Sequence, residues 1–402
     1  MTIKPTSKID PSGKDMIEFI QMICEKVGPR IGGSKEENEA GDIMFDTMSS
    51  FCDNVERTEF ECHPRGFLDY IWVTAALYIA GAISYFFIPL LSILLLFLGL
   101  AVYFIQQNLI KEVIDFLFPK KKSFHVIGKI KPNQSPKRLV LLGGHHDSAY
   151  EFPLFSKLGG KSAILIFSAV LIVLLNIILG IVKSISIILG TFSPSVIFLI
   201  DLIQLILFVI GVIVILIIAK FLRSNTVVMG ANDNLSAVAA IIEVGKYFSK
   251  NKPENTEIWL VSFAGEEHMR GSKRFVSKYK QELMERDAMM FNLECLSADY
   301  FLLATAEPFF FAKHSIKVVD LVKKAADDLE ISIRVGPLKF AGSDSANFSR
   351  KGLKATTLFG LSKKGTPTDW HTINDIPERL SGEKIAKATE IALHFVELVD
   401  RD

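Results

Sequence analysis

Two long stretches of this 402-residue chain carry almost no charge, and they limit its possible folds more than any other feature. From Tyr70 to Ile110 the chain has no Asp, Glu, Lys or Arg, and Pro89 lies near the middle of this run. A helix needs about 20 apolar residues to cross a bilayer, so the run fits two spans with a turn at Pro89. Helices in the core of a water-soluble protein rarely extend this far without a polar face. We therefore predict a transmembrane hairpin here.

A second apolar block fits another hairpin. Residues 163–182 and 202–219 are uncharged, and the Ser193-Pro194 dipeptide between them is typical of a turn. Hydrophobic residues make up 50% of the whole chain, which also favours a membrane protein. We predict an integral, multi-pass protein with four transmembrane helices in two hairpins, so the lipid bilayer is one expected partner.

The rest of the chain alternates between short β-rich runs and helical patterns, which is typical of an α/β fold with a parallel or mixed sheet covered on both faces. Strands are predicted at residues 55–61, 124–130, 138–142, 258–263, 289–293, 331–335 and 355–359, and helices at 14–27, 236–249, 272–284, 314–329 and 381–398. The hairpins interrupt this pattern. We therefore predict one α/β domain in three pieces, residues 1–66, 111–161 and 221–402, with the hairpins at 67–110 and 162–220.

The net charge and the cysteine content indicate which partners and which cellular compartment to expect. The formal net charge is +1 at pH 7, so no overall field attracts nucleic acid, and none is expected as a partner. The four cysteines form no CxxC pair and are typical of free thiols in a reducing compartment. A homo-oligomer is compatible with this composition.

Five short segments of the α/β part hold most of its metal-capable residues. They are GGHHDS at residues 143–148, GANDN at 230–234, FAGEE at 263–267, NLE at 292–294 and DWHT at 369–372. Each also has a purely structural interpretation, since adjacent glutamates are common at helix starts and Asn-Asp-Asn is common in turns. Together they supply two imidazoles and four carboxylates, mostly at strand ends. That is the ligand mixture of a dinuclear hydrolytic zinc site.

The content and order of these segments resemble the M28 family of zinc aminopeptidases and carboxypeptidases. GGHHDS is similar to the family's His-x-Asp motif, GANDN to its bridging-Asp motif, FAGEE to its base-and-ligand pair, NLE to its Asn-Leu-Asp and DWHTINDIPERL to its C-terminal His-Thr-x-x-Asp segment. VGPRIGGSKEE at 27–37 and GSDSANFSRKGLKA at 342–355 resemble two further family segments. The resemblance covers the chain outside the two apolar blocks.

This resemblance implies a fold and a set of metal ligands. The fold is an α/β/α sandwich around a mixed sheet. Two Zn²⁺ ions, or other divalent metal ions, are implied as cofactors. His145 and Glu294 would complete one site, Glu267 and His371 the other, and Asp233 would bridge both.

The resemblance also implies the chemistry. Glu266 would be the general base, taking a proton from a metal-bridging water and returning it to the leaving amine. Asp147 would orient His145. The expected activity is that of a membrane-integral dinuclear zinc exopeptidase, most closely an aminopeptidase, with peptides as substrates.

Two other activities and one inactive state remain open on the same site. A carboxypeptidase would need a basic residue to hold the substrate carboxylate, and Arg270, Arg334 and Lys339 are the candidates. An amidase would act on N-acylated or lipid-like substrates. A non-catalytic scaffold would keep the fold without the activity. Non-catalytic relatives of metalloenzymes usually lose metal ligands, whereas all five proposed ligands are present here.

Three positions depart from the family pattern. Glu294 stands where Asp is commoner, although Glu can coordinate equally well. Ser345 replaces the usual His of the Ser-Asp-His segment. Well-known secreted members have a Tyr shortly before that segment that stabilises the oxyanion, whereas the nearest aromatic residue here is Phe340, which has no hydroxyl group. Losing one oxyanion donor typically costs several kcal/mol of transition-state stabilisation.

Basic residues lie on one side of both predicted hairpins. They are Arg65, Lys111, Lys120, Lys121, Lys122, Lys157, Lys161, Lys220 and Arg223. The Pro89 turn has none, and the turn at 184–194 has only Lys183 at its edge. The positive-inside rule therefore places the α/β domain in the cytoplasm, and the free cysteines agree with this location.

Overall fold

The computed structural model describes residues 8–159, 161–339 and 341–401. Contacts between residues divide the chain into two compact units. Unit 1 comprises Met1–Pro64, Lys120–Glu151 and Thr226–Asp402, and unit 2 comprises Arg65–Pro119 and Phe152–Asn225.

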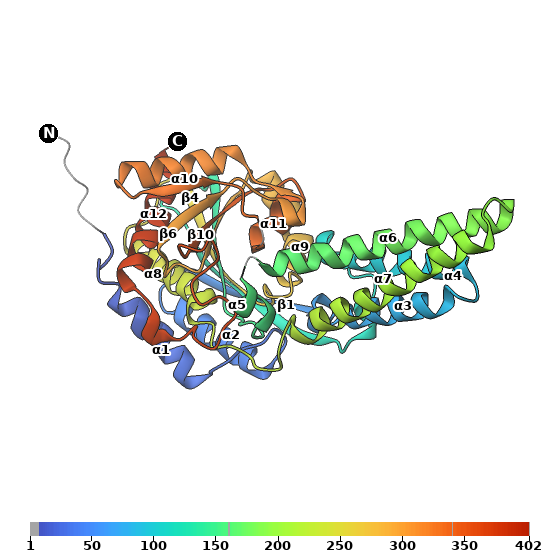
Figure 1. The fold of residues 1–402 in the computed structure, drawn as a ribbon. Helices are drawn as coiled ribbons and strands as arrows, with labels where there is room; N and C mark the ends of the chain where they lie inside the picture. The colour runs from blue at the N-terminus through green and yellow to red at the C-terminus, as the bar shows by residue number, and fades with distance from the viewer. Residues whose placement is uncertain (1–7, 160, 340, 402) are drawn as a thin grey trace. The chain divides into compact units, whose positions relative to one another are not determined.

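Unit 1 is built on an eight-stranded sheet with the strand order β1-β2-β4-β3-β5-β10-β6-β9 (Figure 1). The strands are β1 (Asn54–Cys62), β2 (Lys121–Ile130), β3 (Arg138–His145), β4 (Thr256–Phe263), β5 (Met289–Glu294), β6 (Tyr300–Ala304), β9 (Ile333–Gly336) and β10 (Lys354–Leu361). Strands β4, β3, β5 and β10 run parallel, as do β6 and β9, while β1, β2 and β6 make antiparallel pairs. The mixed sheet expected from the sequence is confirmed. A separate small sheet pairs β7 (Ala306–Glu307) with β8 (Ala312–Lys313).

Helices of unit 1 pack on both faces of this sheet. The first face carries α1 (Lys14–Lys26), α2 (Lys35–Ser49), α8 (Ser236–Lys250), α10 (Ile316–Asp328) and α12 (Gly382–Arg401), and the second carries α9 (Gly271–Glu285) and α11 (Asp344–Ser349). Successive side chains of a strand point to opposite faces. Leu142 and Leu260 therefore join the core under α8, whereas Leu141 and Val261 join the core under α9.

Unit 2 contains four apolar helices, α3 (Tyr70–Ser84), α4 (Pro89–Tyr103), α6 (Lys161–Leu189) and α7 (Pro194–Phe221), together with the short helix α5 (Pro153–Leu158). Three stretches are long and apolar enough to cross a membrane, namely Pro89–Asn108, Lys161–Leu189 and Pro194–Phe221, with mean hydropathies of 2.2, 3.0 and 3.3. They are candidate membrane spans. Helix α3 is apolar but has 15 residues, so the fourth span remains a prediction.

Several polar side chains inside these helices pair with one another. Lys183 Nζ lies 2.8 Å from Asp201 Oδ1, and Tyr85 donates a hydrogen bond to the same oxygen at 2.9 Å. Gln204 Nε2 donates to Asn176 Oδ1 at 2.9 Å, and both of these side chains are fully buried. Polar groups within membrane spans usually face the bundle interior and pair in this way.

Candidate metal centre

The parallel strands of unit 1 bring three of the predicted segments to one edge of the sheet. Strands β3, β4 and β5 end at His145, Phe263 and Glu294, and His145 is in register with Phe263. Two glycines precede His145. A Cβ atom on Gly143 would lie 2.6 Å from the side-chain oxygen of Asn292, and one on Gly144 would lie 2.8 Å from the Cβ of Ala237. Glycine is therefore required here because the neighbouring strand and helix α8 approach the backbone closely.

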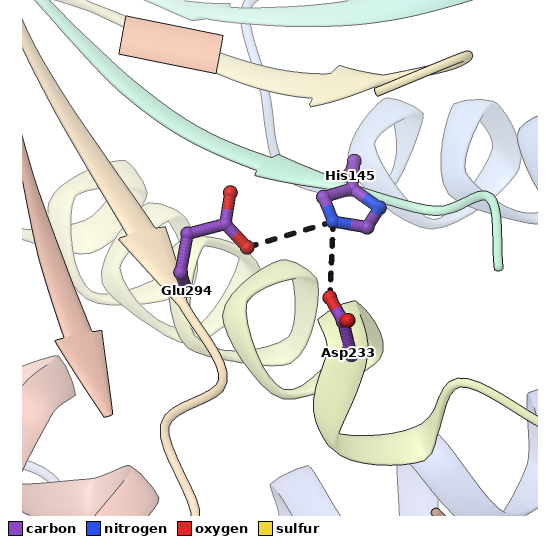
Figure 2. A group of neighbouring side chains, drawn as sticks. All are labelled: His145, Asp233 and Glu294. Atoms are coloured by element: carbon purple, nitrogen blue, oxygen red, sulfur yellow. Dashed lines mark ion pairs between the residues drawn. The ribbon is translucent and has the colours of Figure 1, made fainter. Parts of the chain in front are cut away.

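The first cluster at this edge consists of His145, Asp233 and Glu294 (Figure 2). His145 Nε2 lies 3.3 Å from Asp233 Oδ1 and 3.5 Å from Glu294 Oε2. All three side chains are buried. Their ligand atoms lie within 4.8 Å of one another, so one cation could contact all three.

The second cluster shares Asp233 with the first. His371 Nε2 lies 3.2 Å from Asp233 Oδ2 and 3.0 Å from Glu267 Oε2. These three ligand atoms again lie within 4.8 Å of one another. The structure therefore brings together all five residues that the sequence suggested as ligands, and each oxygen of Asp233 faces a different cluster.

The electrostatics of the two clusters suit bound cations. Burial raises the pKa of the Glu294 carboxyl to about 7, so the protein alone compensates its charged form only in part. Burial disfavours the imidazolium form of His371, but the neighbouring Glu267 and Asp233 carboxylates together outweigh burial and raise the pKa of His371 to about 9. The Oε1 atom of Glu267 is buried and has no hydrogen-bond partner among the described residues. Two imidazoles and three carboxylates are ligand types that zinc prefers, and the Glu267 Oε1 atom is a further oxygen that could bind a cation. The ligand set therefore fits two zinc ions.

Glu266 and Asp147 lie beside the first cluster. Glu266 Oε2 is 3.6 Å from His145 Nε2, and burial raises the pKa of the Glu266 carboxyl well above its usual range. Asp147 Oδ1 is 3.3 Å from His145 Nδ1. The two Asp147 oxygens also accept the backbone N–H groups of Glu266 and Glu267, at 3.1 and 3.2 Å. Asp147 thus contacts both the imidazole and the loop that carries the adjacent glutamates.

Three supporting residues were not assigned roles from the sequence. Asn292 Nδ2 donates to Glu294 Oε1 at 2.9 Å, and Asn234 Nδ2 donates to Glu294 Oε2 at 2.5 Å. Asp375 accepts the backbone N–H groups of Asn232 and Asp233, at 2.6 and 3.1 Å, and burial raises the pKa of its carboxyl to about 7. Asn234 and Asn292 lie within the GANDN and NLE segments, and Asp375 lies four residues after His371. Their closeness in sequence to the proposed ligands could have identified them as supporting residues.

The residues that departed from the family pattern lie in different surroundings. Ser345 is fully buried and donates to the carbonyl oxygen of Thr356 at 2.9 Å, so it fixes helix α11 against β10. Phe340 lies outside the described residues. Of the candidate basic residues, Arg270 is fully buried and donates to the His268 carbonyl oxygen, and Arg334 stacks on Tyr300.

Comparison with known proteins finds a matching family model and solved structures with the same fold. Residues 214–396 match the family model described as Peptidase family M28, a range that includes four of the five ligand segments. No match is found among curated protein sequences. Among solved structures, a zinc aminopeptidase from Bacillus subtilis is 13% identical with a TM-score of 0.57, covering 98% of this chain and 96% of that one. The aminopeptidase from Aneurinibacillus sp. strain AM-1 is 16% identical with a TM-score of 0.57, covering 96% and 93%.

A third solved structure extends the fold beyond peptidases. The glutaminyl cyclase from an Acidobacteriales bacterium is 12% identical with a TM-score of 0.58, covering 100% of this chain and 99% of that one. At such low identity these likenesses establish the fold alone. Residues 214–396 are thus similar to peptidase family M28, and the chain has a fold that zinc aminopeptidases and glutaminyl cyclases share.

Proposed function

We propose that the chain is a dinuclear zinc exopeptidase, most closely an aminopeptidase. The observation that carries the proposal is the shared position of Asp233, whose two oxygens lie 3.3 Å from His145 and 3.2 Å from His371. A bridging carboxylate between two histidine–carboxylate clusters is the arrangement that two-metal hydrolases require. His145, Asp233 and Glu294 would hold one ion, and Asp233, Glu267 and His371 the other.

The chain's own residues supply the proton transfers. Two zinc ions in this centre would act as Lewis acids, lowering the pKa of water and polarising the scissile carbonyl. Glu266 takes the proton of the attacking water on its carboxylate and returns it to the nitrogen of the leaving amine. Its raised pKa suits it to hold that proton between the two steps. Asp147 keeps the Glu266 backbone and the His145 ring in fixed relation.

The charge of the site favours a substrate with a free amino group. Five buried or nearly buried carboxylates belong to the clusters or lie beside them, those of Asp147, Asp233, Glu266, Glu267 and Glu294. Two divalent ions would carry four positive charges against these five negative charges, so the five carboxylates and two ions together would stay negative. A substrate carboxylate would be repelled there, whereas an α-ammonium group would be attracted.

A panel of related peptides tests this assignment. Purified full-length protein with zinc should cleave a peptide with a free N-terminus, and N-acetylation should abolish cleavage while C-terminal amidation should not. A chelator should stop the reaction, and added zinc should restore it. Release of acetate from the N-acetylated peptide would identify an amidase instead. Cleavage that survives N-acetylation but is lost on C-terminal amidation would identify a carboxypeptidase. Cyclisation of a peptide with N-terminal glutamine would point to the cyclases that share the fold.

We also propose that unit 2 is embedded in a membrane with unit 1 in the cytoplasm. His145 and Asp233 lie 3.3 Å apart, yet helices α6 and α7 come between them in sequence. The second hairpin must therefore begin and end on the same side of the bilayer. Basic residues such as Lys157, Lys161 and Lys220 flank that side, which the positive-inside rule assigns to the cytoplasm.

Cysteine labelling tests this orientation. Single cysteines replace Ser193, in the turn before α7, and Ser156, in α5, in a variant without native cysteines; both serines are exposed. In intact cells an impermeant thiol reagent should label the Ser193 position, and it should label the Ser156 position only after permeabilisation. Labelling of the Ser156 position from outside would reverse the orientation. Labelling of both positions in intact cells would show that the block does not cross the membrane.

A further inference from the structure

The segment at residues 27–37, VGPRIGGSKEE, resembles a family motif but holds no proposed ligand or base. It lies against the end of β3. The Arg30 N–H donates to Ser148 Oγ at 2.8 Å, and the Ser148 N–H donates to the Arg30 carbonyl at 2.9 Å. Ile31 and Ser148 form a parallel β-bridge. The segment is thus fixed three residues beyond His145.

The Arg30 side chain joins two of the turns that carry proposed ligands. It is fully buried, and its guanidinium donates to four carbonyl oxygens. Nε donates to His146 at 2.8 Å, Nη1 to Gly28 and Met229 at 2.6 and 3.0 Å, and Nη2 to Gly230 at 3.1 Å. His146 directly follows His145, and Gly230 begins the turn that holds Asp233. A planar fork with five donors can hold both turns together, whereas a lysine ammonium has three donors on one atom.

The Glu37 side chain joins the same segment to a third functional loop. Its Oε1 accepts the Gly265 N–H at 2.9 Å, and its Oε2 accepts the Gly33 N–H and the Ser123 hydroxyl, both at 2.6 Å. Glu37 is fully buried. Gly265 directly precedes Glu266 and has a φ of 66°, a conformation that side chains other than glycine rarely adopt.

We propose that residues 30–37 are a positioning clamp for the two-metal centre, with Arg30 setting the separation of His145 from Asp233 and Glu37 fixing the loop of Glu266 and Glu267. The inference rests on the proposed function, because it assumes the two zinc ions. Both residues act through backbone groups next to ligands and touch neither substrate nor metal. Groups that orient metal ligands typically change metal affinity by about 10–100-fold when they are replaced.

Zinc titration of Arg30→Lys tests the first half of the clamp. Both dissociation constants should rise by about 10–100-fold, because Arg30 holds the turn of Asp233, which serves both ions. Arg286→Lys is the matched control, since Arg286 is ion-paired with Glu257 at the opposite end of β4. A purely structural role would lower the melting temperature of the metal-free protein and leave zinc affinity unchanged. Unchanged affinity in folded Arg30→Lys would overturn the assignment of Arg30.

Glu37→Gln tests the second half and gives a different signature. It should lower the affinity for one of the two zinc ions, the one held by Glu267. It should also lower kcat with little change in KM, because the loop that carries Glu266 is no longer held in place. Ser123→Ala is the matched control, because it removes one donor to Glu37 and keeps the bond to Gly265. If Arg30→Lys does not fold, the Glu37→Gln measurements alone decide whether the segment acts as a clamp. Zinc affinity and kcat equal to wild type in Glu37→Gln would overturn the clamp, and wild-type protein that binds no zinc would overturn the proposed function with it.

Discussion

Glu266→Gln is expected to lower kcat by about 10²–10⁴-fold, the usual contribution of a general base, while both zinc ions stay bound. The amide has nearly the shape of the carboxyl but cannot take a proton from the attacking water. Glu266 lies 3.6 Å from His145 and belongs to neither ligand cluster, so the metal centre should not change. The measurements are steady-state kinetics on the free-amine peptide and zinc content of the same sample.

Glu267→Ala is the matched comparison, because the two glutamates are neighbours on one loop. Glu267 Oε2 lies 3.0 Å from His371, and its loss should release the ion of the second cluster. Glu266→Gln should therefore lose rate without losing zinc, whereas Glu267→Ala should lose both. Equal loss of zinc from the two variants, or full activity in Glu266→Gln, would show that the base is assigned to the wrong residue.

Asp233→Ala is expected to remove both zinc ions and to reduce turnover to the rate without enzyme. Its two oxygens face different clusters, so no other single replacement should disturb both sites as strongly. Glu294→Ala should remove only one ion, because Glu294 belongs to the first cluster alone. Elemental analysis of the purified variants checks both expectations. An Asp233→Ala protein that keeps one tightly bound zinc would contradict a bridging role.

The sequence predicted much of the fold because its patterns are strong where elements are buried. All seven predicted strands and all five predicted helices are present, with ends shifted by a few residues. Helix α2 was not predicted, since its sequence KEENEAGDIMFDTMS is mostly polar and only a narrow stripe is buried. Strand β6, Tyr300–Ala304, was not predicted either.

The residues of the candidate site that lie in short local motifs could be predicted from the sequence. The five proposed ligands lie in short segments with recognisable residue order, and the sheet brings their side chains together because parallel strands end at one edge. Arg30 and Glu37 could not be assigned in this way. The partners that connect them to the proposed ligands and base are backbone groups at least 116 residues away along the chain, at His146, Gly230 and Gly265. No local pattern specifies such contacts.

The helices of unit 2 show the same limit. Apolar runs predicted the helices of unit 2, but helix length depends on where the chain turns. Helix α3 ends at Ser84 after 15 residues, whereas α6 and α7 extend to 29 and 28 residues. The pairing of Lys183 with Asp201 explains how two charged residues are accommodated in otherwise apolar helices.

The zinc content of the wild-type protein tests the central claim most directly. The full-length chain, purified in detergent with zinc present and then freed of loosely bound metal, should contain about two zinc ions per chain, because five ligands form two clusters that share Asp233. Folded protein that holds a single zinc ion, or none, would contradict the two-metal centre.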